Sequence, residues 1–241
     1  MPKIKHKETG KVLFTYDGDS LKHVNFKNVN LSHADMRGLD LTGACLDYVD
    51  LSNADLEKAD MSYVDMVGVN LRGANLKHAK VGNATLRYAN LNWADLAHAD
   101  LRYADLTYAG LAYAQLPEAD LHHADFEGAY LKEANLKSAD LKNTNFKCAK
   151  LRGACLAHAR MYGTNFLGAN LRGVNLENAE GMHVCLEKAD LTDARVKNLK
   201  LYVSYTHDAD FTGVCLEDAK ISEVVLNGDL THIYSIREYK Q

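Results

Sequence analysis

The sequence predicts an all-β fold, a solenoid of stacked coils with four sides each, and three observations lead to that prediction. First, an apolar residue recurs at every fifth position from Leu21 to Leu226, and 40 of these 42 positions hold Leu, Phe, Met, Val or Ile. Second, the position two residues before each of them is usually small and apolar: it holds Ala in 27 repeats and Val in 9. Third, unusual residues recur twenty apart, as Phe126, Phe146 and Phe166 do.

A period of five residues fits neither a helix nor a flat strand. Five residues turn a helix by about 500°, so the leucines would spread over all of its sides. In a flat strand an odd step moves each leucine to the opposite face. Both apolar registers point inward if each repeat is one short extended piece followed by a corner at the two variable residues. Gly and Asn recur at the second variable residue and suit such a turn.

Spacing by twenty residues implies four corners in each coil. We therefore expect about ten coils and, with the separation of paired strands, a rod roughly 50 Å long. The inward leucines fill its axis, and the small alanines allow the walls to lie close to that axis. We predict that the repeat domain comprises residues 21–228.

The two ends of a stacked solenoid expose unpaired backbone and need caps. Residues 1–20 predict an N-terminal hairpin cap, because Thr9 and Gly10 suit a turn and Val12, Phe14 and Tyr16 alternate after it. Residues 229–241 predict a C-terminal cap or a homodimerisation segment, formed by either a short helix or a strand. The apolar residues proposed for that contact are Leu230, Ile233, Tyr234 and Ile236.

Composition narrows the class of protein. The 241 residues include 28 basic and 32 acidic side chains, and the net charge of −4 does not predict a polyanion binder. No apolar run reaches the roughly 18 residues of a membrane span, so we expect a soluble, cytoplasmic chain without a membrane partner. The five cysteines contain no CxxC pair, which disfavours disulfides and zinc. No catalytic, cofactor or metal motif is present, so we expect no enzyme, no cofactor and no metal site.

Segments such as ADLEKAD, ANLKHAK and ADLRYAD repeat the pattern A(D/N)LXX. Over residues 21–226 the chain therefore resembles the pentapeptide-repeat family. The resemblance implies a right-handed quadrilateral β-helix. Some members of that family are dimeric, DNA-like rods that bind DNA gyrase or topoisomerase IV and protect it from quinolones, whereas many others have no known activity. The resemblance implies a DNA-mimicking topoisomerase binder as the most specific function. The alternative is a structural or regulatory scaffold for protein–protein interaction, unrelated to topoisomerases.

Aromatic residues gather at the second variable position in the middle of the chain. At a spacing of twenty, Tyr88 is expected to stack on Tyr108, and Trp93 on Tyr113, which would stabilise the corners. Tyr and Trp also dominate protein-binding hot spots. These residues are therefore a candidate contact surface for a protein partner, which we call the aromatic belt. Its members are Tyr88, Trp93, His98, Tyr103, Tyr108 and Tyr113.

Aspartates precede many of the leucines and fall into rows spaced by twenty residues. Such side chains commonly hydrogen-bond the local backbone of turns. A continuous row of them would instead imitate duplex DNA, which carries one charge per about 1.7 Å of axis. Lysines and arginines interrupt the rows in this chain. The candidate acidic strip consists of Asp35, Asp55, Asp100, Asp105, Asp120, Asp125 and Asp140.

Basic residues concentrate between positions 132 and 172. Lys132, Arg152 and Arg172 are twenty apart, so they are expected on one face in successive coils, where they form a candidate basic patch. The patch is either an ordinary solvated surface or a docking site for an acidic protein surface or nucleic acid. A separate acidic segment, residues 35–65, argues against coating by DNA, and we expect no direct nucleic-acid binding.

Overall fold

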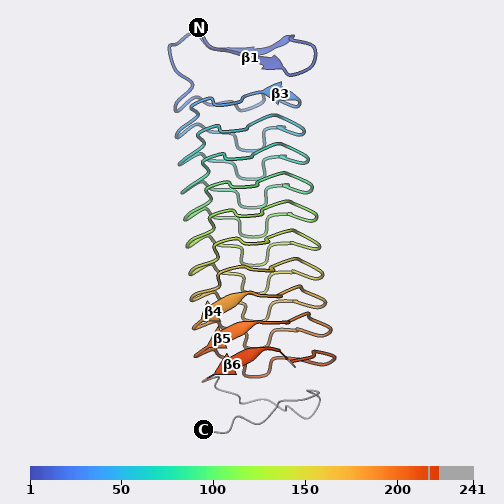
Figure 1. The fold of residues 1–241 in the computed structure, drawn as a ribbon. Helices are drawn as coiled ribbons and strands as arrows, with labels where there is room; N and C mark the ends of the chain where they lie inside the picture. Colours follow the sequence, from blue (N-terminus) through green and yellow to red (C-terminus); the bar gives the residue numbers. More distant parts are fainter. Residues whose placement is uncertain (217, 223–241) are drawn as a thin grey trace.

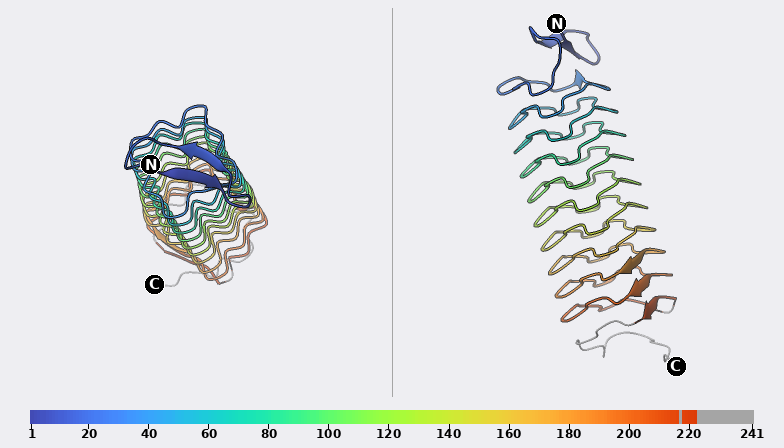
Figure 2. Two further views of the ribbon diagram at one scale, coloured as in Figure 1. Left: turned by 90° about the horizontal axis from the view of Figure 1, so that it is seen from above. Right: turned by 90° about the vertical axis from the view of Figure 1, so that its left-hand side faces the viewer.

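The computed structural model describes residues 1–216 and 218–222, which form a long stack of coils (Figure 1). Seen along the stack, successive coils overlie one another with a small offset (Figure 2). The described part is all-β, as predicted. Its strands are β1 (Lys3–His6), β2 (Val12–Thr15), β3 (Ala34–Asp35), β4 (Glu180–Met182), β5 (Lys200–Tyr202) and β6 (Lys220–Ser222). The predicted contact residues Leu230, Ile233, Tyr234 and Ile236 lie outside the described residues.

Most of the stack is held by parallel bridges of a single residue, each joining positions exactly one coil of twenty residues apart. Asn90 bridges Gly110, for example: the Leu91 amide donates to the Gly110 carbonyl at 2.7 Å, and the Gly110 amide donates to the Ala89 carbonyl at 2.8 Å. Each coil carries four such bridge positions, five residues apart. The twenty-residue coil with four sides that the spacing predicts is therefore present in the backbone hydrogen bonds.

Nearly every corner in the described part is a hydrogen-bonded turn, the exceptions including those after Gly181 and Leu201. At the corner after Leu86, the Ala89 amide donates to the Leu86 carbonyl at 3.0 Å, and Tyr88 between them has a φ of 58°. A positive φ at the third residue of such a turn is the type II pattern, which favours Gly or Asn. Many second variable residues are instead Tyr, His, Trp or Glu, and each such residue in the left-handed region costs about 1–2 kcal/mol of backbone energy.

The leucine and alanine registers form one continuous apolar axis. Leu101 and Leu111 are completely buried, and so are nearly all of their equivalents. The rings of Phe126, Phe146 and Phe166 stack along the axis with centroids 5.0 and 5.2 Å apart, as their twenty-residue spacing predicts. Because the interior is nearly uniform from coil to coil, differences between the sides of the rod arise on its outer surface.

Strands β1 and β2 form an antiparallel hairpin at the N-terminal end of the stack (Figure 1). Strand β1 also pairs antiparallel with β3, which belongs to the first coils. Ile4 is completely buried, and the Phe14 ring packs against Phe26 with centroids 4.9 Å apart. The hairpin thus contributes both hydrogen bonds and apolar side chains to the end of the axis.

Candidate functional site

The residues of the aromatic belt lie on four different corners, so they do not share one face, and their contact with a partner stays a prediction. Each step of five residues moves the chain to the next side of the coil, and residues adjacent in the belt therefore point in different directions. Only residues twenty apart share a corner. The four pairs that do so are Tyr88 with Tyr108, Trp93 with Tyr113, His98 with His78, and Tyr103 with His123.

Within each corner the rings are stacked, as the sequence predicts. The centroids of Tyr88 and Tyr108 are 5.6 Å apart, and those of Trp93 and Tyr113 are 5.4 Å apart. The Arg72 guanidinium covers the Trp93 ring at 5.0 Å, and the Lys132 ammonium lies 5.8 Å from the Tyr113 centroid. The faces of Trp93 and Tyr113 are thus covered by neighbours from the same column, while 54% of Trp93 remains exposed. These rings present their edges to solvent.

The acidic strip is also divided, because its seven residues lie on three sides of the rod. Asp100, Asp120 and Asp140 bridge one another on one side. Asp105 and Asp125 share a second side, and Asp35 and Asp55 share a third. All seven carboxylates accept the amide two residues further on, at 2.9–3.4 Å. They therefore perform the structural role in the turn that aspartates at such positions usually have.

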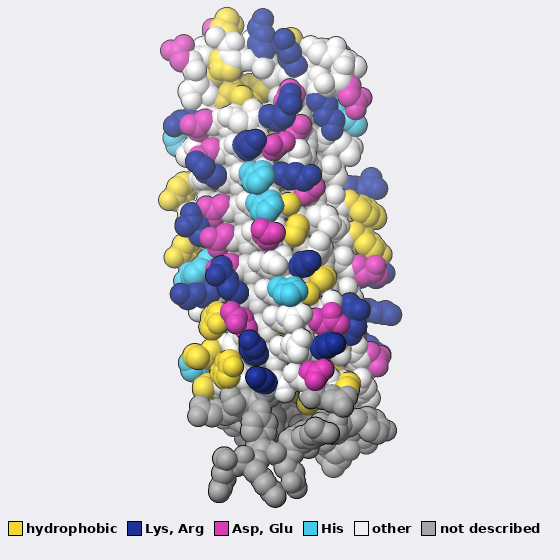
Figure 3. Space-filling model, in the orientation of Figure 1, with side chains coloured by type: hydrophobic (Ala, Val, Ile, Leu, Met, Phe, Trp, Pro, Cys, Tyr) yellow, Lys and Arg dark blue, Asp and Glu magenta, His cyan; other side chains and the backbone are white. Residues whose placement is uncertain are grey.

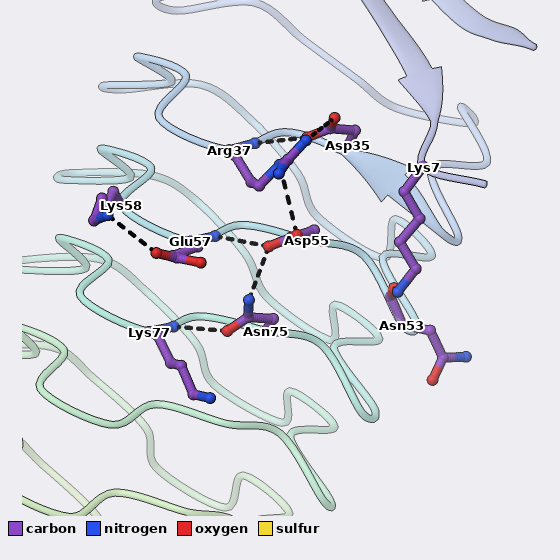
Figure 4. A network of polar contacts seen from close by, with 9 residues as sticks. All are labelled: Lys7, Asp35, Arg37, Asn53, Asp55, Glu57, Lys58, Asn75 and Lys77. Atoms are coloured by element: carbon purple, nitrogen blue, oxygen red, sulfur yellow. Dashed lines mark hydrogen bonds and ion pairs between the residues drawn. The ribbon is translucent and has the colours of Figure 1, made fainter. Parts of the chain in front are cut away.

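Most of these carboxylates are also paired with a cation. Arg37 donates two hydrogen bonds to Asp35, at 2.8 and 2.7 Å, and lies 3.6 Å from Asp55 (Figure 4). Its guanidinium holds the pKa of the Asp35 carboxyl below its usual range. Asp55 also accepts the Asn75 side-chain amide at 2.9 Å.

The same compensation occurs on the side that carries Asp100, Asp120 and Asp140. Arg102 binds Asp100 at 2.6 Å and lies 3.6 Å from Asp120, while Arg160 binds Asp140 at 2.8 Å. Asp40 and Asp60, which the predicted strip omitted, lie in the same column and pair with lysines at 2.9 and 3.2 Å. Figure 3 shows basic and acidic side chains beside one another on the face drawn there. We call this column with its paired cations the aspartate side.

The side opposite the aspartate side has a different surface. Its bridge positions in the middle of the rod are Asn70, Asn90, Gly110, Tyr130, Lys150 and Asn170, and the same column has Asp50 before them and Asp190 and Asp210 after them. Two residues further along each coil lie Arg72, Asn92, Ala112, Lys132, Arg152 and Arg172. Between Asn70 and Arg172 these two columns contain five bases and no acid, and we call this stretch the basic side. The three residues of the predicted basic patch are thus part of a longer row.

Two corners that carry stacked aromatic residues flank the basic side. Tyr88 and Tyr108 lie at the corner where the chain enters this side, and Trp93 and Tyr113 lie at the corner where it leaves. Between these rings the side chains are small, so the surface there projects less far from the rod axis than the rings do. Asn92 accepts the Ala112 amide at 2.7 Å and donates to Asn90 at 2.7 Å. The result is a strip of small side chains between two aromatic ridges, continuous with the bases of the next coils.

The match to a family model covers most of the coils. The model for pentapeptide repeats matches residues 20–57, 50–87, 84–122, 119–157 and 159–198, with eight copies. The chain belongs to the pentapeptide-repeat family. Members of this family are generally non-enzymatic binding proteins.

Solved pentapeptide-repeat structures resemble this one. HetL, a protein involved in heterocyst differentiation regulation from the cyanobacterium Nostoc sp. strain PCC 7120, is 28% identical, with 85% of this chain and 90% of that chain covered and a TM-score of 0.41. A trypsin-treated variant of QnrB1, a plasmid-mediated fluoroquinolone resistance protein, is 15% identical, with 82% and 89% covered and a TM-score of 0.50. At that identity the likeness to QnrB1 concerns the fold alone. No curated protein matches the chain.

Two clusters of the pentapeptide-repeat chain bring together residue types that bind metals. The first is His6, Glu8 and His33, and the second is Asp120, His122 and Asp140. In the first, the Nδ1 atom of His6 accepts the Glu8 amide at 3.2 Å, and the rings of His6 and His33 are stacked rather than directed at one point. In the second, both carboxylates already face arginines.

Within residues 1–216 and 218–222 the pentapeptide-repeat chain has no helix, and so none that is long and apolar enough to cross a membrane. The sequence reasoning missed the basic side as a unit, because its bases and its aromatic corners are far apart in the linear chain. Writing the sequence in rows of twenty residues would have aligned Arg72, Lys132, Arg152 and Arg172 and shown that their two columns hold no acid between Asn70 and Arg172.

Proposed function

We propose that the chain is a non-enzymatic binding protein whose rod surface docks a protein partner on the basic side. One observation carries this proposal: the exposed rings of Tyr88, Tyr108 and Trp93 and the half-buried ring of Tyr113 flank a strip of small side chains. Tyr, Trp and Arg are the residues that most often dominate the energy of protein interfaces. Because stacking fixes the rings before binding, a partner loses little side-chain entropy in contacting them.

Corner residues on every side of the rod share a positive φ, so the backbone energy by itself does not distinguish the basic side. Tyr88, Trp93, Tyr108 and Tyr113 all have φ between 57° and 61°, a region that favours Gly. Stacking between coils offsets only part of the backbone energy of the positive φ. More than half of Trp93 and of Tyr108 remains exposed and makes no contact within the described part of the chain. A contact with a partner would bury the remaining aromatic surface.

Photo-cross-linking tests the docking proposal. Tyr130 lies on the basic side and is 43% exposed, whereas Tyr63 is 65% exposed at a corner that does not border this side. With p-benzoylphenylalanine at position 130, we expect discrete cross-linked products in extracts of the source cells, and these should disappear when Trp93→Ala and Tyr108→Ala are added. The Tyr103→Ala variant is the control, because Tyr103 is equally exposed on another corner. Equal products from positions 130 and 63 would contradict the proposal.

A type II topoisomerase, contacted through a DNA-like surface, is the most specific candidate partner. The family resemblance supports it, and so does the fold shared with QnrB1, a fluoroquinolone resistance protein. The paired carboxylates of the acidic strip weigh against it, since a DNA mimic needs uncompensated negative charge. A gyrase supercoiling assay with quinolone protection decides the matter. Absence of any effect at micromolar protein would leave a regulatory or structural scaffold as the function.

Three further features belong to this proposal. We take the solenoid to be right-handed, as the family resemblance implies. We take residues 1–20 and 229–241 to cap residues 21–228, with Leu230, Ile233, Tyr234 and Ile236 as a homodimer contact. We also retain the expectation of a cytoplasmic protein without cofactors. Sedimentation of the full chain against a chain ending at residue 228 would test the dimer, because only the full chain should dimerise.

A further inference from the structure

The basic side differs in charge from the other three sides at the same height. Between Asn70 and Arg172 its outward columns contain Arg72, Lys132, Lys150, Arg152 and Arg172 and no acid. Each of the other sides carries acids over this range. They are Asp100, Asp120 and Asp140 on the aspartate side, Asp105, Asp125 and Glu127 on the next, and Asp95 on the last, whereas the column of the basic side meets acids only beyond the range, at Asp50 and Asp190. The other sides carry bases as well, but over this range the basic side has the largest net positive charge of a chain whose net charge is −4.

The bases of this side have weak partners within the chain. Lys150 and Arg152 form no ion pair with any residue in the described part. Lys132 lies 3.9 Å from Glu133, and Arg172 lies 3.9 Å from Asp190, at the outer limit of an ion pair. Arg102 on the opposite side reaches its carboxylate at 2.6 Å. These cations thus keep most of their capacity to bind an external anion.

Next to the bases lies a hollow large enough for a side chain. It has a volume of about 310 Å³ and is lined by Glu133, Arg152, Gly153, Arg172, Gly173 and Asp193. The hollow exists because the corner column has glycines at 153 and 173. A Cβ at Gly173 would meet no atom within 4 Å, so the space beside the two guanidiniums is open.

We infer that the occupant of the basic side is an extended acidic polypeptide segment of the partner, with one of its carboxylates in the hollow between Arg152 and Arg172. Its apolar part lies between the ridges of Tyr108 and Tyr113. This inference rests on the proposed function and names the chemistry of its partner. Guanidiniums bind carboxylates with paired hydrogen bonds, and the side offers two of them in successive coils.

Two features favour a polypeptide over a nucleic acid. Nucleobases stack on free aromatic faces, whereas the faces of Trp93 and Tyr113 are covered by Arg72 and Lys132. The hollow also has Glu133 and Asp193 on its lining. These carboxylates would repel the closely spaced charges of a phosphate backbone more than a single carboxylate, because the repulsion grows with the charge of the ligand.

The test measures binding of a fluorescein-labelled peptide, with an apolar half and a Glu-rich half, by fluorescence anisotropy of the full chain. The variant Lys150→Glu with Arg152→Glu removes charge from the basic side. The matched control is Lys137→Glu with Lys142→Glu, which changes the net charge equally on two other sides; neither lysine has an ion pair in the described residues. A single-stranded oligonucleotide is titrated in parallel, and thermal unfolding verifies that each variant is folded.

We expect the Lys150→Glu, Arg152→Glu variant to weaken peptide binding about tenfold and the control by less than about twofold, with weaker binding at higher salt. Equal weakening by both variants, tighter binding of the oligonucleotide with the same dependence, or no binding of the peptide would overturn the inference. The cross-linking at position 130 separates this result from the docking proposal. If its products persist in the Lys150→Glu, Arg152→Glu variant, the rod docks a partner without an acidic segment.

Discussion

The aspartate side and the basic side lie on opposite faces of the same coils and use the same backbone geometry, yet they handle charge differently. On the aspartate side Arg102 binds Asp100 two residues before it, and Arg160 binds Asp140 twenty residues before it. On the basic side Arg152 stands at the equivalent position to Arg102, but the bridge residue before it is Lys150. The solenoid geometry therefore allows a carboxylate and a cation to pair at every coil. The residue types at these positions alone decide whether a side is neutral or charged.

This comparison separates two properties of the rod. The interior is the same behind all four sides, because the inward positions hold mostly leucine and alanine whatever residues lie on the surface. The exterior distinguishes them, because each side receives only every fourth repeat. A sequence can therefore vary one side for binding while its core stays unchanged. The predictions below test that separation, from the largest effect to the smallest.

The largest effect is expected in the axis, and it should be the same on both sides. Leu101 lies behind the aspartate side and Leu111 behind the basic side, and both are completely buried. Replacing either with Ala removes apolar contacts and leaves a cavity, which should cost about 2–5 kcal/mol of unfolding free energy. Urea denaturation measures both variants. Costs that differ by more than about 2 kcal/mol would show that the interior is not uniform.

A smaller effect distinguishes the two surfaces. Arg102→Ala deprives Asp100 and Asp120 of their cation, whereas Arg152→Ala removes a base that has no ion pair in the described part of the chain. Because the Arg102 side chain is 53% exposed, its loss should cost less than about 1 kcal/mol. The Arg152 variant should stay within about 0.5 kcal/mol of the parent. The same denaturation experiment compares them, and a larger cost for Arg152→Ala would contradict the account.

Acid should destabilise the fold through the aspartate side. Arg102 lowers the pKa of Asp100, and the Thr42 hydroxyl with Lys22 lowers the pKa of Asp40 to about 2. A carboxyl whose folded pKa lies below its unfolded value of about 3.9 contributes its full stability above that value. The contribution is lost as the pH falls toward the folded pKa. Thermal midpoints should therefore decline between about pH 4 and pH 2, and the decline should be smaller in Arg102→Ala.

The smallest effect is expected at the corners. In Tyr108→Gly and Tyr103→Gly the loss of ring stacking is offset by relief of the positive φ, which is 57° and 60° in the two residues. Both variants should remain within about 0.5 kcal/mol of the parent. Only Tyr108→Gly should reduce the cross-linking from position 130, because only Tyr108 borders the basic side. Equal reduction by both would mean that the partner contacts more than one side.

Periodic features could be predicted from the sequence, and features that depend on the choice of side could not. The stacked rings of Phe126, Phe146 and Phe166 follow directly from their spacing. The residues of the aromatic belt do not share one face, because residues five apart in the sequence, such as Tyr103 and Tyr108, occupy different corners. The pairing of Asp100 with Arg102 depends on side-chain conformations that no spacing specifies. The role of Gly153 and Gly173 in forming a hollow emerged only with the neighbouring coils in place.

The most direct test of the account is a distance measurement along the basic side, because every surface assignment depends on residues twenty apart standing in one column. Spin labels at Arg72 and Arg172, in a variant without the native cysteines, are separated by five coils. Pulsed electron resonance should give a distance of about 24 Å, and moving the second label to Arg152 should shorten it by about 5 Å. A distance beyond about 35 Å, or no shortening, would contradict the twenty-residue coil.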